Sequence, residues 1–467
     1  MTTLQTDCLW WRDLALPETD RLVADHNLDV AIIGAGFTGL WTAWFLKQLK
    51  PDWRIALFDQ QHPGFGASGR NGGWLIGGIE GQDSWLTKMP PDQRQRSQQL
   101  LYGIVESVKQ QCQQYDIDCD LRHEGVVYSA ARYPEQTRIA QLWLHSLQQA
   151  GHRERDFRWL SHQELEPLLQ LPKQQGGIYS PHCATINPAK LIAGLCAGLR
   201  RQGVTIYAHA DVSELGHRTL RINNQFNIQA ETIVVATEAF PGRHKALAKK
   251  RLPVFSAVIA TKTLTAEQWQ GSVQKTGLAF ADVSRSVTYG QRTANDELVF
   301  GARGGYLFGK RSRFEFTPDE AVFDQPKKYR QRLFPHLDPA DVAYQWGGSL
   351  AMSRRFSPYC GYDASRGLAT AGGYGGEGVG ASHLFGHTLA ELIAGEDSAR
   401  TQQPWVSNHF LRSQKNWEPE PIPWLAYQGI GAVLSLEDYV CHYDKLTPLR
   451  KPIVAASEWL AGFLHSS

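Results

Sequence analysis

Three glycines near the N-terminus, followed by an acid, are the residues with the clearest chemical implication. Gly34, Gly36 and Gly39 form a Gly-x-Gly-x-x-Gly turn, and Asp59 lies 25 positions after the first of them. Glycines at such positions let the backbone approach a pyrophosphate, whose charge is stabilised by the N-terminus of a following helix. An acid at that distance can bind a ribose hydroxyl group. The predicted dinucleotide-binding residues here are Gly34, Ala35, Gly36, Phe37, Thr38, Gly39, Asp59 and Gln60.

The elements that would position these residues are visible in the same stretch. An apolar run at residues 30–33 precedes the glycine turn, and a helical pattern follows it. A second apolar run, at residues 54–58, ends in Asp59. Strand, glycine turn, helix, strand and acid is the order expected of a dinucleotide-binding unit.

A second glycine-rich run, at residues 64–73, indicates which dinucleotide is bound. A nicotinamide-binding fold has no standing need for such a segment, whereas the longer flavin cofactor must lie against a second stretch of bare backbone. A flexible surface loop is the alternative, but an Arg-Asn pair brings nothing to a simple linker. The residues predicted to contact the cofactor from this run are Gly66, Ala67, Ser68, Arg70, Asn71, Gly72 and Gly73.

Two later fragments strengthen a resemblance to a known family. Residues 368–380 form an apolar strand followed by glycines that open a helix, and residues 232–240 form a buried strand with a small-residue turn. Together with the run at 64–73, they resemble the D-amino acid oxidase superfamily of flavoproteins over about residues 28–400. The resemblance is greatest to its amine-oxidising branch, which includes gamma-glutamylputrescine oxidoreductase, glycine oxidase and sarcosine oxidase.

The resemblance implies FAD as cofactor and adds further contact residues. Backbone N–H groups at the helix start near residue 378 would stabilise the negative charge that develops on the reduced flavin. Relatives often carry His where this chain has Glu377, whose carboxylate could face a cationic amine substrate or lie away from the site. The added residues are Val212, Ala236, Thr237, Gly347, Gly373, Tyr374, Gly376, Glu377, Gly378 and Val379.

The family resemblance also implies an α/β fold of two domains. The first is a Rossmann-like FAD-binding domain of the glutathione-reductase type, expected in three stretches at 28–84, 185–244 and 345–400. The second is an antiparallel β-sheet substrate (cap) domain, expected at 85–184 and 245–344. Residues 401–467 form a C-terminal extension beyond the shared region.

Hydrophobic periodicity gives a coarse picture of the remaining elements. Residues 92–150 are predicted to be mostly helical, and residues 252–305 to form strands with a hairpin around 294–296. Two helical patterns follow, near 425–440 and 452–464. We expect them to pack on the body, with a peripheral membrane patch or a subunit contact as alternatives.

Hydride transfer from a carbon bearing nitrogen to flavin N5, followed by hydrolysis of the imine, is the reaction that fits such a cofactor. The cofactor carries the difficult step, so no catalytic triad and no metal are needed. Trp74 follows the second glycine run and Tyr374 lies in the closing turn, so both are candidates to border the flavin or substrate. Arg303, Tyr306 and Arg354 are candidates to bind a substrate carboxylate, since arginine offers a bidentate fork.

The FAD is predicted to be noncovalent. Sarcosine oxidase relatives attach FAD to a cysteine ahead of the closing glycine run, but Cys360 lies only 12 residues before Gly372, and Leu350 is nearer the expected place. No histidine occurs in the second glycine run. Two other functions stay open: an FAD-dependent dehydrogenase of a hydroxy acid or polyol that reduces a quinone, and a non-catalytic flavoprotein subunit.

Composition narrows the partners and the cellular setting. The formal net charge of +2 and the lack of basic runs with interleaved aromatics argue against nucleic-acid binding. The seven cysteines form no Cys-x-x-Cys pair and no metal-ligand spacing, which is typical of reduced cytosolic thiols. There is no recognisable signal peptide and no long apolar run. We therefore expect a cytoplasmic enzyme with a small amine or amino-acid substrate and an electron acceptor such as oxygen or a quinone.

Overall fold

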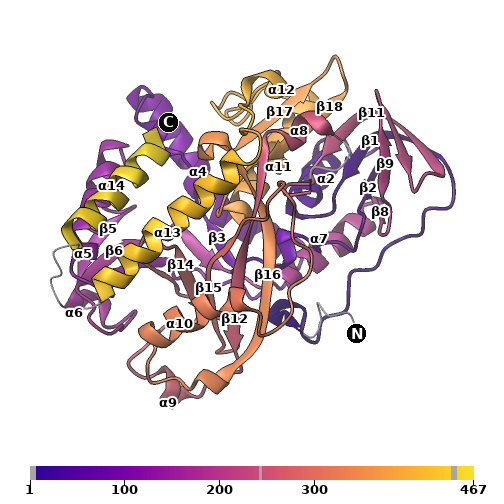
Figure 1. Cartoon of the computed structure of the whole chain (residues 1–467). Helices are drawn as coiled ribbons and strands as arrows, with labels where there is room; N and C mark the ends of the chain where they lie inside the picture. The colour runs from indigo at the N-terminus through magenta and orange to yellow at the C-terminus, as the bar shows by residue number, and fades with distance from the viewer. Residues whose placement is uncertain (1–6, 241–243, 443–449, 467) are drawn as a thin grey trace.

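A computed structural model describes residues 7–240, 244–442 and 450–466, with side chains except at residues 442 and 460–466. Its framework is two large β-sheets with helices around them (Figure 1). In that view the strands of the first sheet lie on the right, and the long strands β12, β15 and β16 of the second run through the centre. The predicted fold class, an α/β nucleotide-binding unit joined to a sheet-based second unit, is confirmed.

The first sheet is mostly parallel, with strand order β17-β18-β11-β1-β2-β8. Its neighbouring strands pair in parallel except β17, which is antiparallel to β18. The four residues of β2 are all buried, as expected for a strand covered on both faces. The strands are β1 (His26–Ile33), β2 (Ile55–Phe58), β8 (Thr205–Tyr207), β11 (Phe226–Val235), β17 (Tyr359–Asp363) and β18 (Leu368–Gly372), with β9 (Val212–Leu215) and β10 (Thr219–Ile222) joined to β11.

Four helices accompany this sheet, and α2 (Phe37–Leu49) is the central one. It begins directly after the glycine turn and is buried from Phe37 to Leu46, because it packs against both α11 (Gly378–Ala394) and α7 (Pro188–Arg201). The long α4 (Pro91–Gln114) packs in turn on α11. A Cβ atom at Gly386 would lie 2.7 Å from the Cβ of Trp41, so α2 and α11 approach closely. This packing fixes the N-termini of α2 and α11 near one another.

The second sheet has the order β16-β12-β15-β14-β13-β4-β6-β5 and is antiparallel except between β13 and β4. The predicted hairpin around 294–296 is confirmed, since β14 and β15 pair on either side of it. The strands are β4 (Val126–Ala130), β5 (Arg158–Ser161), β6 (Gly176–Ser180), β12 (Arg251–Thr261), β13 (Ala279–Asp282), β14 (Thr288–Arg292), β15 (Leu298–Gly305) and β16 (Val342–Ser353). A separate two-stranded ribbon joins β3 (Trp74–Ile76) to β7 (Cys183–Thr185).

Two stretches differ from the sequence-based expectation. Strand β16 lies within the stretch expected from residue 345 to belong to the nucleotide-binding unit, but it pairs with β12 in the second sheet, and the chain rejoins the first sheet only at β17. Within residues 92–150, α4 and α5 (Glu135–Gln149) are helical, but a non-helical stretch at 115–134 that contains β4 separates them. A five-residue strand between two long helices is difficult to predict, because it is too short to show a clear hydrophobic periodicity.

The C-terminal extension lies on the second sheet's side of the molecule. Its two long helices, α13 (Ile422–His442) and α14 (Arg450–Ser466), are the yellow pair in Figure 1. Ion pairs tie them to the body: Arg285 binds Glu437, and Arg450 binds Glu135 at 2.6 Å. Over the described ranges, no helix combines the length and apolar character needed to cross a membrane. The shorter helices are α3 (Asp83–Leu86), α6 (His162–Leu165), α8 (Lys245–Ala248), α9 (Ala266–Trp269), α10 (Asp324–Leu333) and α12 (Phe410–Ser413).

Candidate functional site

A cavity of about 580 Å³ joins residues from several separated segments of the chain. It is lined by the glycine turn after β1, the residues after β2, the second glycine run, the end of β11 and the start of α11. The predicted cofactor residues among its lining are Gly34, Gly36, Phe37, Thr38, Asp59, Gln60, Gly66, Ala67, Ser68, Asn71, Val212, Ala236, Thr237, Tyr374, Gly376, Gly378 and Val379. Residues predicted from four distant stretches of sequence thus surround one space.

The N-terminus of α2 is where these segments meet. The Phe37 backbone N–H donates to Ser68 Oγ at 2.9 Å, which ties the second glycine run to the first. The Thr38 and Tyr374 hydroxyl groups share a hydrogen bond of 2.9 Å, which ties in the closing turn before α11. Tyr374 is buried, and burial raises the pKa of its phenol well above the usual value. Bonds between residues 31 and 336 positions apart therefore hold the cavity's centre in place.

Close backbone contacts explain the glycine spacing. Gly34 has a φ of +103°, and a Cβ atom there would lie 2.6 Å from the carbonyl oxygen of Ala236 at the end of β11. A Cβ at Gly39 would lie 2.0 Å from the Gly34 carbonyl oxygen. A side chain at Gly34 would push the turn away from the end of β11, and one at Gly39 would push α2 away from the turn and β1. These glycines are required by packing as well as by any ligand.

Asp59 is held by backbone groups at the cavity's edge. Its Oδ2 accepts a hydrogen bond from the Ala35 N–H at 2.7 Å, and its Oδ1 accepts one from the Gln61 N–H at 2.9 Å. Burial raises the pKa of this carboxyl group, and the two backbone donors oppose the shift. The side chain is thus fixed in position beside the glycine turn, and binding of a ribose remains a prediction.

Glu238 supports the closing turn and was not foreseen from the sequence. Its carboxylate accepts hydrogen bonds from the backbone N–H groups of Gly373 at 3.1 Å and Tyr374 at 3.3 Å. Arg251, which is fully buried, donates to the Glu238 carbonyl oxygen and to Tyr359 and Thr370. An acid directly after the Ala236-Thr237 turn was the only signal available in the sequence.

Several other predicted cofactor residues lie beside the cavity and shape its wall. Arg70 is buried, and its guanidinium donates to the backbone oxygens of Phe65 at 2.7 Å and Gly347 at 3.4 Å. Asn71 accepts from the Gly73 N–H at 2.8 Å, which folds the second glycine run back on itself. The predicted residues outside the cavity's lining are Ala35, Gly39, Arg70, Gly72, Gly73, Gly347, Gly373 and Glu377.

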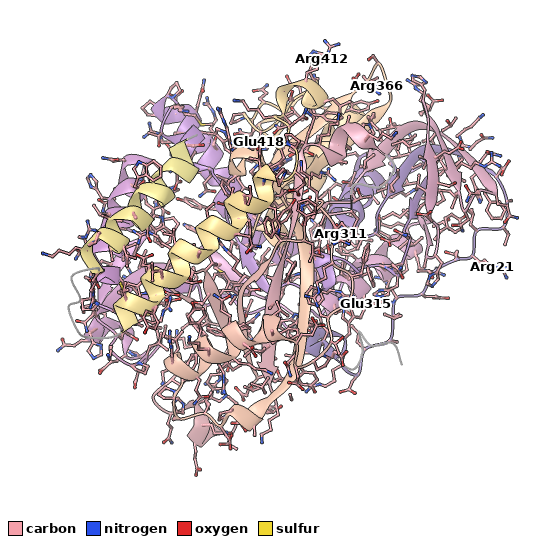
Figure 2. The ribbon with its side chains drawn as sticks, in the orientation of Figure 1. Arg21, Arg311, Glu315, Arg366, Arg412 and Glu418 are labelled. Atoms are coloured by element: carbon pink, nitrogen blue, oxygen red, sulfur yellow. The ribbon has the colours of Figure 1, made fainter. Side chains whose placement is uncertain are left out.

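The structure separates the five catalytic candidates. Tyr374 lines the cavity, whereas Trp74 lies in β3 and donates to the Gly290 carbonyl oxygen at 3.2 Å. Arg354 forms an ion pair of 3.1 Å with Glu418, which lies near the upper end of α13 in Figure 2. Tyr306 donates to Glu420, and Arg303 lies in β15 opposite Ser256. Arg354 and Tyr306 are thus engaged by glutamates of the extension, and a role in binding substrate carboxylates stays a prediction.

Cationic residues that the sequence reasoning missed also line the cavity. Lys310 and Arg311 lie in the loop after β15, and Figure 2 shows Arg311 in the middle of the molecule. The neighbouring Ser312 donates to the Ala239 carbonyl oxygen, which holds this loop against the segment that follows β11. The adjacent Lys-Arg pair was the only available sequence signal, and surface loops commonly carry such pairs.

Glu377 lies at the start of α11, and a second glutamate, Glu80, lies near it. Glu80 is within reach of the closing turn, since a Cβ at Gly375 would lie 3.3 Å from its Cγ. Burial raises the pKa of Glu377 to about 8, helped by repulsion from Glu80. The Oε2 atom of Glu377 is buried without a hydrogen-bond partner. By contrast, the carboxylate of Glu238, on the other side of the turn, accepts hydrogen bonds from two backbone N–H groups.

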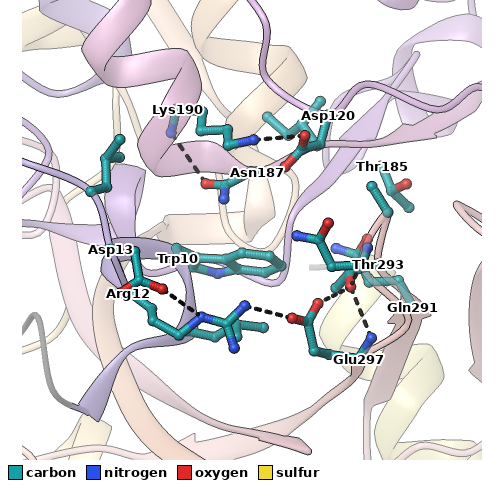
Figure 3. Close-up of a pocket in the computed structure, with 15 residues that line it drawn as sticks. Trp10, Arg12, Asp13, Asp120, Thr185, Asn187, Lys190, Gln291, Thr293 and Glu297 are labelled. Carbon is teal, nitrogen blue, oxygen red and sulfur yellow. Dashed lines mark hydrogen bonds and ion pairs between the residues drawn. The ribbon is translucent and has the colours of Figure 1, made fainter. Parts of the chain in front are cut away.

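A second, more polar cavity of about 230 Å³ lies between the N-terminal segment around Trp10, the start of α7 and the turn after β14 (Figure 3). Trp10 forms part of its wall and donates to the Asn71 carbonyl oxygen at 2.7 Å. Its charged groups are paired within the chain: Arg12 with Glu297 and Lys190 with Asp120, each at 2.8 Å. Arg12 also pairs with Asp13 at 3.5 Å, so every charged side chain of this cavity has a partner of opposite charge within the chain. Among the residues that the structure describes, no cluster of His, Cys, Asp and Glu could hold a metal ion.

A mostly parallel sheet with a glycine turn between its strand β1 and helix α2, and an acid after the next strand, defines a dinucleotide-binding type of fold. The FAD dependent oxidoreductase (DAO) family matches residues 29–392, and the chain belongs to this family. It is therefore an FAD-dependent oxidoreductase, and the family resemblance inferred from the sequence is confirmed. The bare glycine backbone lining the larger cavity fits that cofactor.

Individual relatives support the same placement. The chain is 25% identical to gamma-glutamylputrescine oxidoreductase of Escherichia coli (strain K12), over 81% of this chain and 86% of that protein. It is 26% identical to an L-2-hydroxyglutarate dehydrogenase of Escherichia coli, over 44% of this chain and 46% of the other. The crystal structure of glycine oxidase from Geobacillus kaustophilus has the same fold, with a TM-score of 0.63, 22% identity and coverage of 82% and 98%.

Proposed function

We propose that this protein oxidises a C–N bond of an amine or amino acid with FAD held in the larger cavity. The observation that carries the proposal is the junction at the N-terminus of α2, where Ser68 and Tyr374 bring the second glycine run and the closing turn to the first glycine turn. A long dinucleotide would be bound by backbone from all three. Gamma-glutamylputrescine oxidoreductase, a relative that matches 81% of this chain, supports an amine as the substrate class.

The protein's own residues would divide the binding of FAD among them. Gly34 and Gly36 at the start of α2 would face the pyrophosphate, with Lys310 and Arg311 supplying positive charge. Asp59 would bind the adenosine ribose, and Val212 would lie near the adenine. The turn at Tyr374–Gly378, held by Glu238, would border the flavin ring.

When bound, FAD supplies the acceptor for two electrons and one proton, taken together as a hydride at flavin N5. The substrate carbon loses that hydride while its nitrogen lone pair forms the new C=N bond, and water then converts the imine to a carbonyl compound and a free amine or ammonia. The protein must present the amine in its neutral form and exclude water. An acceptor such as oxygen or a quinone regenerates the oxidised cofactor.

The attachment of FAD is proposed to be noncovalent. Cys360 lies in β17, is fully buried, and donates weakly to the Phe385 carbonyl oxygen, so its thiol is engaged within the packed interior. Burial also raises its pKa well above the usual range, which keeps the thiol protonated and unreactive. Acid precipitation of the holoenzyme should leave all the yellow colour in the supernatant, and a yellow pellet would contradict this part of the proposal.

Anaerobic mixing with matched substrate panels tests the reaction. Loss of the flavin absorbance at about 450 nm on adding amines or amino acids, but not hydroxy acids, would support the proposal. Bleaching by hydroxy acids alone would replace it with the dehydrogenase alternative. Bleaching by neither, in protein with stoichiometric FAD, would favour a non-catalytic flavoprotein subunit.

A further inference from the structure

Two glutamates beside the closing turn lack any partner of opposite charge. Glu80 follows β3, and Glu377 is the residue from which α11 begins. Neither carboxyl group forms a hydrogen bond or an ion pair with the described part of the chain, and the buried Oε2 of Glu377 has no partner at all. Buried carboxylates are normally paired or hydrogen-bonded, because removal from water is costly for the ion.

Both glutamates belong to one small region. Helix α11 starts against β3, since a Cβ at Gly380 would lie 2.1 Å from the Ile76 carbonyl oxygen. The same turn contacts Glu80, because a Cβ at Gly375 would lie 3.4 Å from Glu80 Oε2. The turn itself, through Tyr374, Gly375 and Gly376, lines the large cavity. The pair is therefore adjacent to the space in which we expect substrate and flavin to meet.

A cluster of aromatic residues includes one, Tyr128, that lies near the two carboxyl groups. The Trp74 ring makes edge-type contacts with Tyr128, at a centroid distance of 6.4 Å, and with Tyr289, at 6.0 Å. Burial raises the pKa of the Tyr128 phenol, and the charges of the two glutamates raise it further. Aromatic faces and carboxylates together are the groups that proteins use to bind ammonium ions.

Within the described part of the chain, no lysine, arginine or histidine acts on the charge of these glutamates. The titratable groups that influence them, or are influenced by them, are Asp83, Tyr128 and Cys183, along with each other. Asp83 has its own partner, since its Oδ1 lies 2.9 Å from His152 Nε2. The two arginines expected to bind a substrate carboxylate are elsewhere: Arg354 is paired with Glu418, and Arg303 is in β15.

We propose that Glu80 and Glu377 bind a positively charged group of the substrate, so that the enzyme prefers amines with a second ammonium group over zwitterionic amino acids. This inference rests on the proposed amine oxidation and sharpens its substrate class. The nitrogen on the oxidised carbon must be neutral when the hydride leaves, whereas a carboxylate pair stabilises a charged nitrogen. The bound ammonium is therefore a different nitrogen from the one that reacts.

Proton linkage gives this site a signature that does not depend on turnover. Burial raises the pKa of Glu80 to about 7, with a contribution from Asp83, and that of Glu377 to about 8. Both groups are thus partly protonated near neutral pH in the free protein. A bound cation favours the ionised carboxylates, so binding must release protons to the buffer.

The first test compares three compounds of equal chain length in anaerobic flavin reduction. Putrescine carries two ammonium groups, butylamine carries one, and gamma-aminobutyrate replaces the second ammonium with a carboxylate. We expect half-saturation by putrescine at a concentration at least about tenfold below that of either other compound. Equal half-saturation, or a preference for gamma-aminobutyrate, would overturn the inference and leave amine oxidation standing.

The second test uses a double variant that combines Glu80→Gln with Glu377→Gln. The matched control is Glu154→Gln, which replaces an exposed glutamate. Calorimetric titration of the FAD-loaded proteins with tetramethylammonium, in two buffers of different protonation enthalpy, measures proton release on binding. We expect release in the wild type and control, and its loss in the double variant at unchanged FAD content. Release that persists in the double variant would overturn the inference. Bleaching by hydroxy acids alone would instead overturn the proposed function.

Discussion

The nucleotide-binding region and the C-terminal extension use the same residue types under opposite constraints. Near the cofactor cavity, Gly39 has no room for a side chain, whereas Gly429 in α13 would meet no atom within 4 Å if it carried a Cβ. The Oε2 atom of Glu377 is buried without a hydrogen-bond partner, whereas Glu437 of α13 is bound by Arg285. The carboxylate beside the cavity thus lacks the countercharge that the carboxylate of the extension has. Buried atoms without a hydrogen-bond partner occur in both regions, such as the Tyr427 hydroxyl of the extension, so the missing countercharge is what distinguishes the cavity region.

Replacing Gly39 with alanine should have the largest effect of the changes considered. The added Cβ would lie 2.0 Å from the Gly34 carbonyl oxygen, which is backbone and cannot rotate away. We expect α2 to shift, FAD to be lost, and the free energy of unfolding to fall by more than about 3 kcal/mol. The ratio of flavin to protein absorbance and a urea titration measure both effects. Gly103→Ala, on open surface of α4, is the control. Retention of FAD at normal stability by Gly39→Ala would contradict the packing argument.

Two arginines, one buried beside the cavity region and one paired with the extension, are expected to differ in their contribution to stability. Arg251 is fully buried and bonds to the Glu238 carbonyl, Tyr359 and Thr370, while Arg354 forms its pair with Glu418 at the surface. Arg251→Met should lower the free energy of unfolding by about 3–5 kcal/mol, because it leaves buried acceptors unpaired. Arg354→Met should cost less than about 1 kcal/mol. Chemical denaturation measures both, and equal losses would mean that burial does not decide the difference.

Glu377 should make the free protein less stable as the pH rises. Its pKa is raised to about 8 in the folded state, so the protonated form is the one that the fold favours. The stabilisation from this group is complete below the pKa of an unfolded glutamate, and it is lost as the pH rises through about 8. Glu377→Gln should therefore raise the melting temperature of the FAD-free protein at about pH 8.5 and change it little at about pH 4. Glu154→Gln should show no such dependence, and a rise at both pH values would argue against the raised pKa.

The parts of the site that the sequence predicted are those in which neighbouring residues carry the signal. The turn at Gly34–Gly39 and the strand ending at Asp59 could be recognised because the spacing of glycines, apolar residues and acid lies within one short stretch. Lys310, Arg311, Glu238 and Glu80 could not, since each reaches the site through tertiary packing. Glu80, for example, matters only because the turn at Gly375 comes to rest against it.

The same reasoning explains why the sequence did not reveal the sheet to which β16 belongs. β16 carries Trp346 and Gly347, which contact Arg70 of the second glycine run, so the strand lies beside predicted cofactor residues although it belongs to the second sheet. Its membership of a sheet depends on an eleven-residue register with β12, and pairing between distant strands leaves little trace in either one alone.

The smallest expected effect is a gain of stability in the extension. Gly429 and Gly431 lie within α13, and a Cβ at either position would meet no atom within 4 Å. Alanine at each should stabilise the helix by about 0.5–1 kcal/mol, since it removes the backbone entropy of glycine without creating a contact. Urea denaturation of single and double variants measures the gain, which should be additive. Ile422, Leu425, Leu436 and Tyr439 are exposed along the same helix. A loss of stability that depends on protein concentration would therefore show that another copy of the chain covers this face. The glycines of the extension would then resemble those beside the cavity, because both would allow another backbone to approach closely.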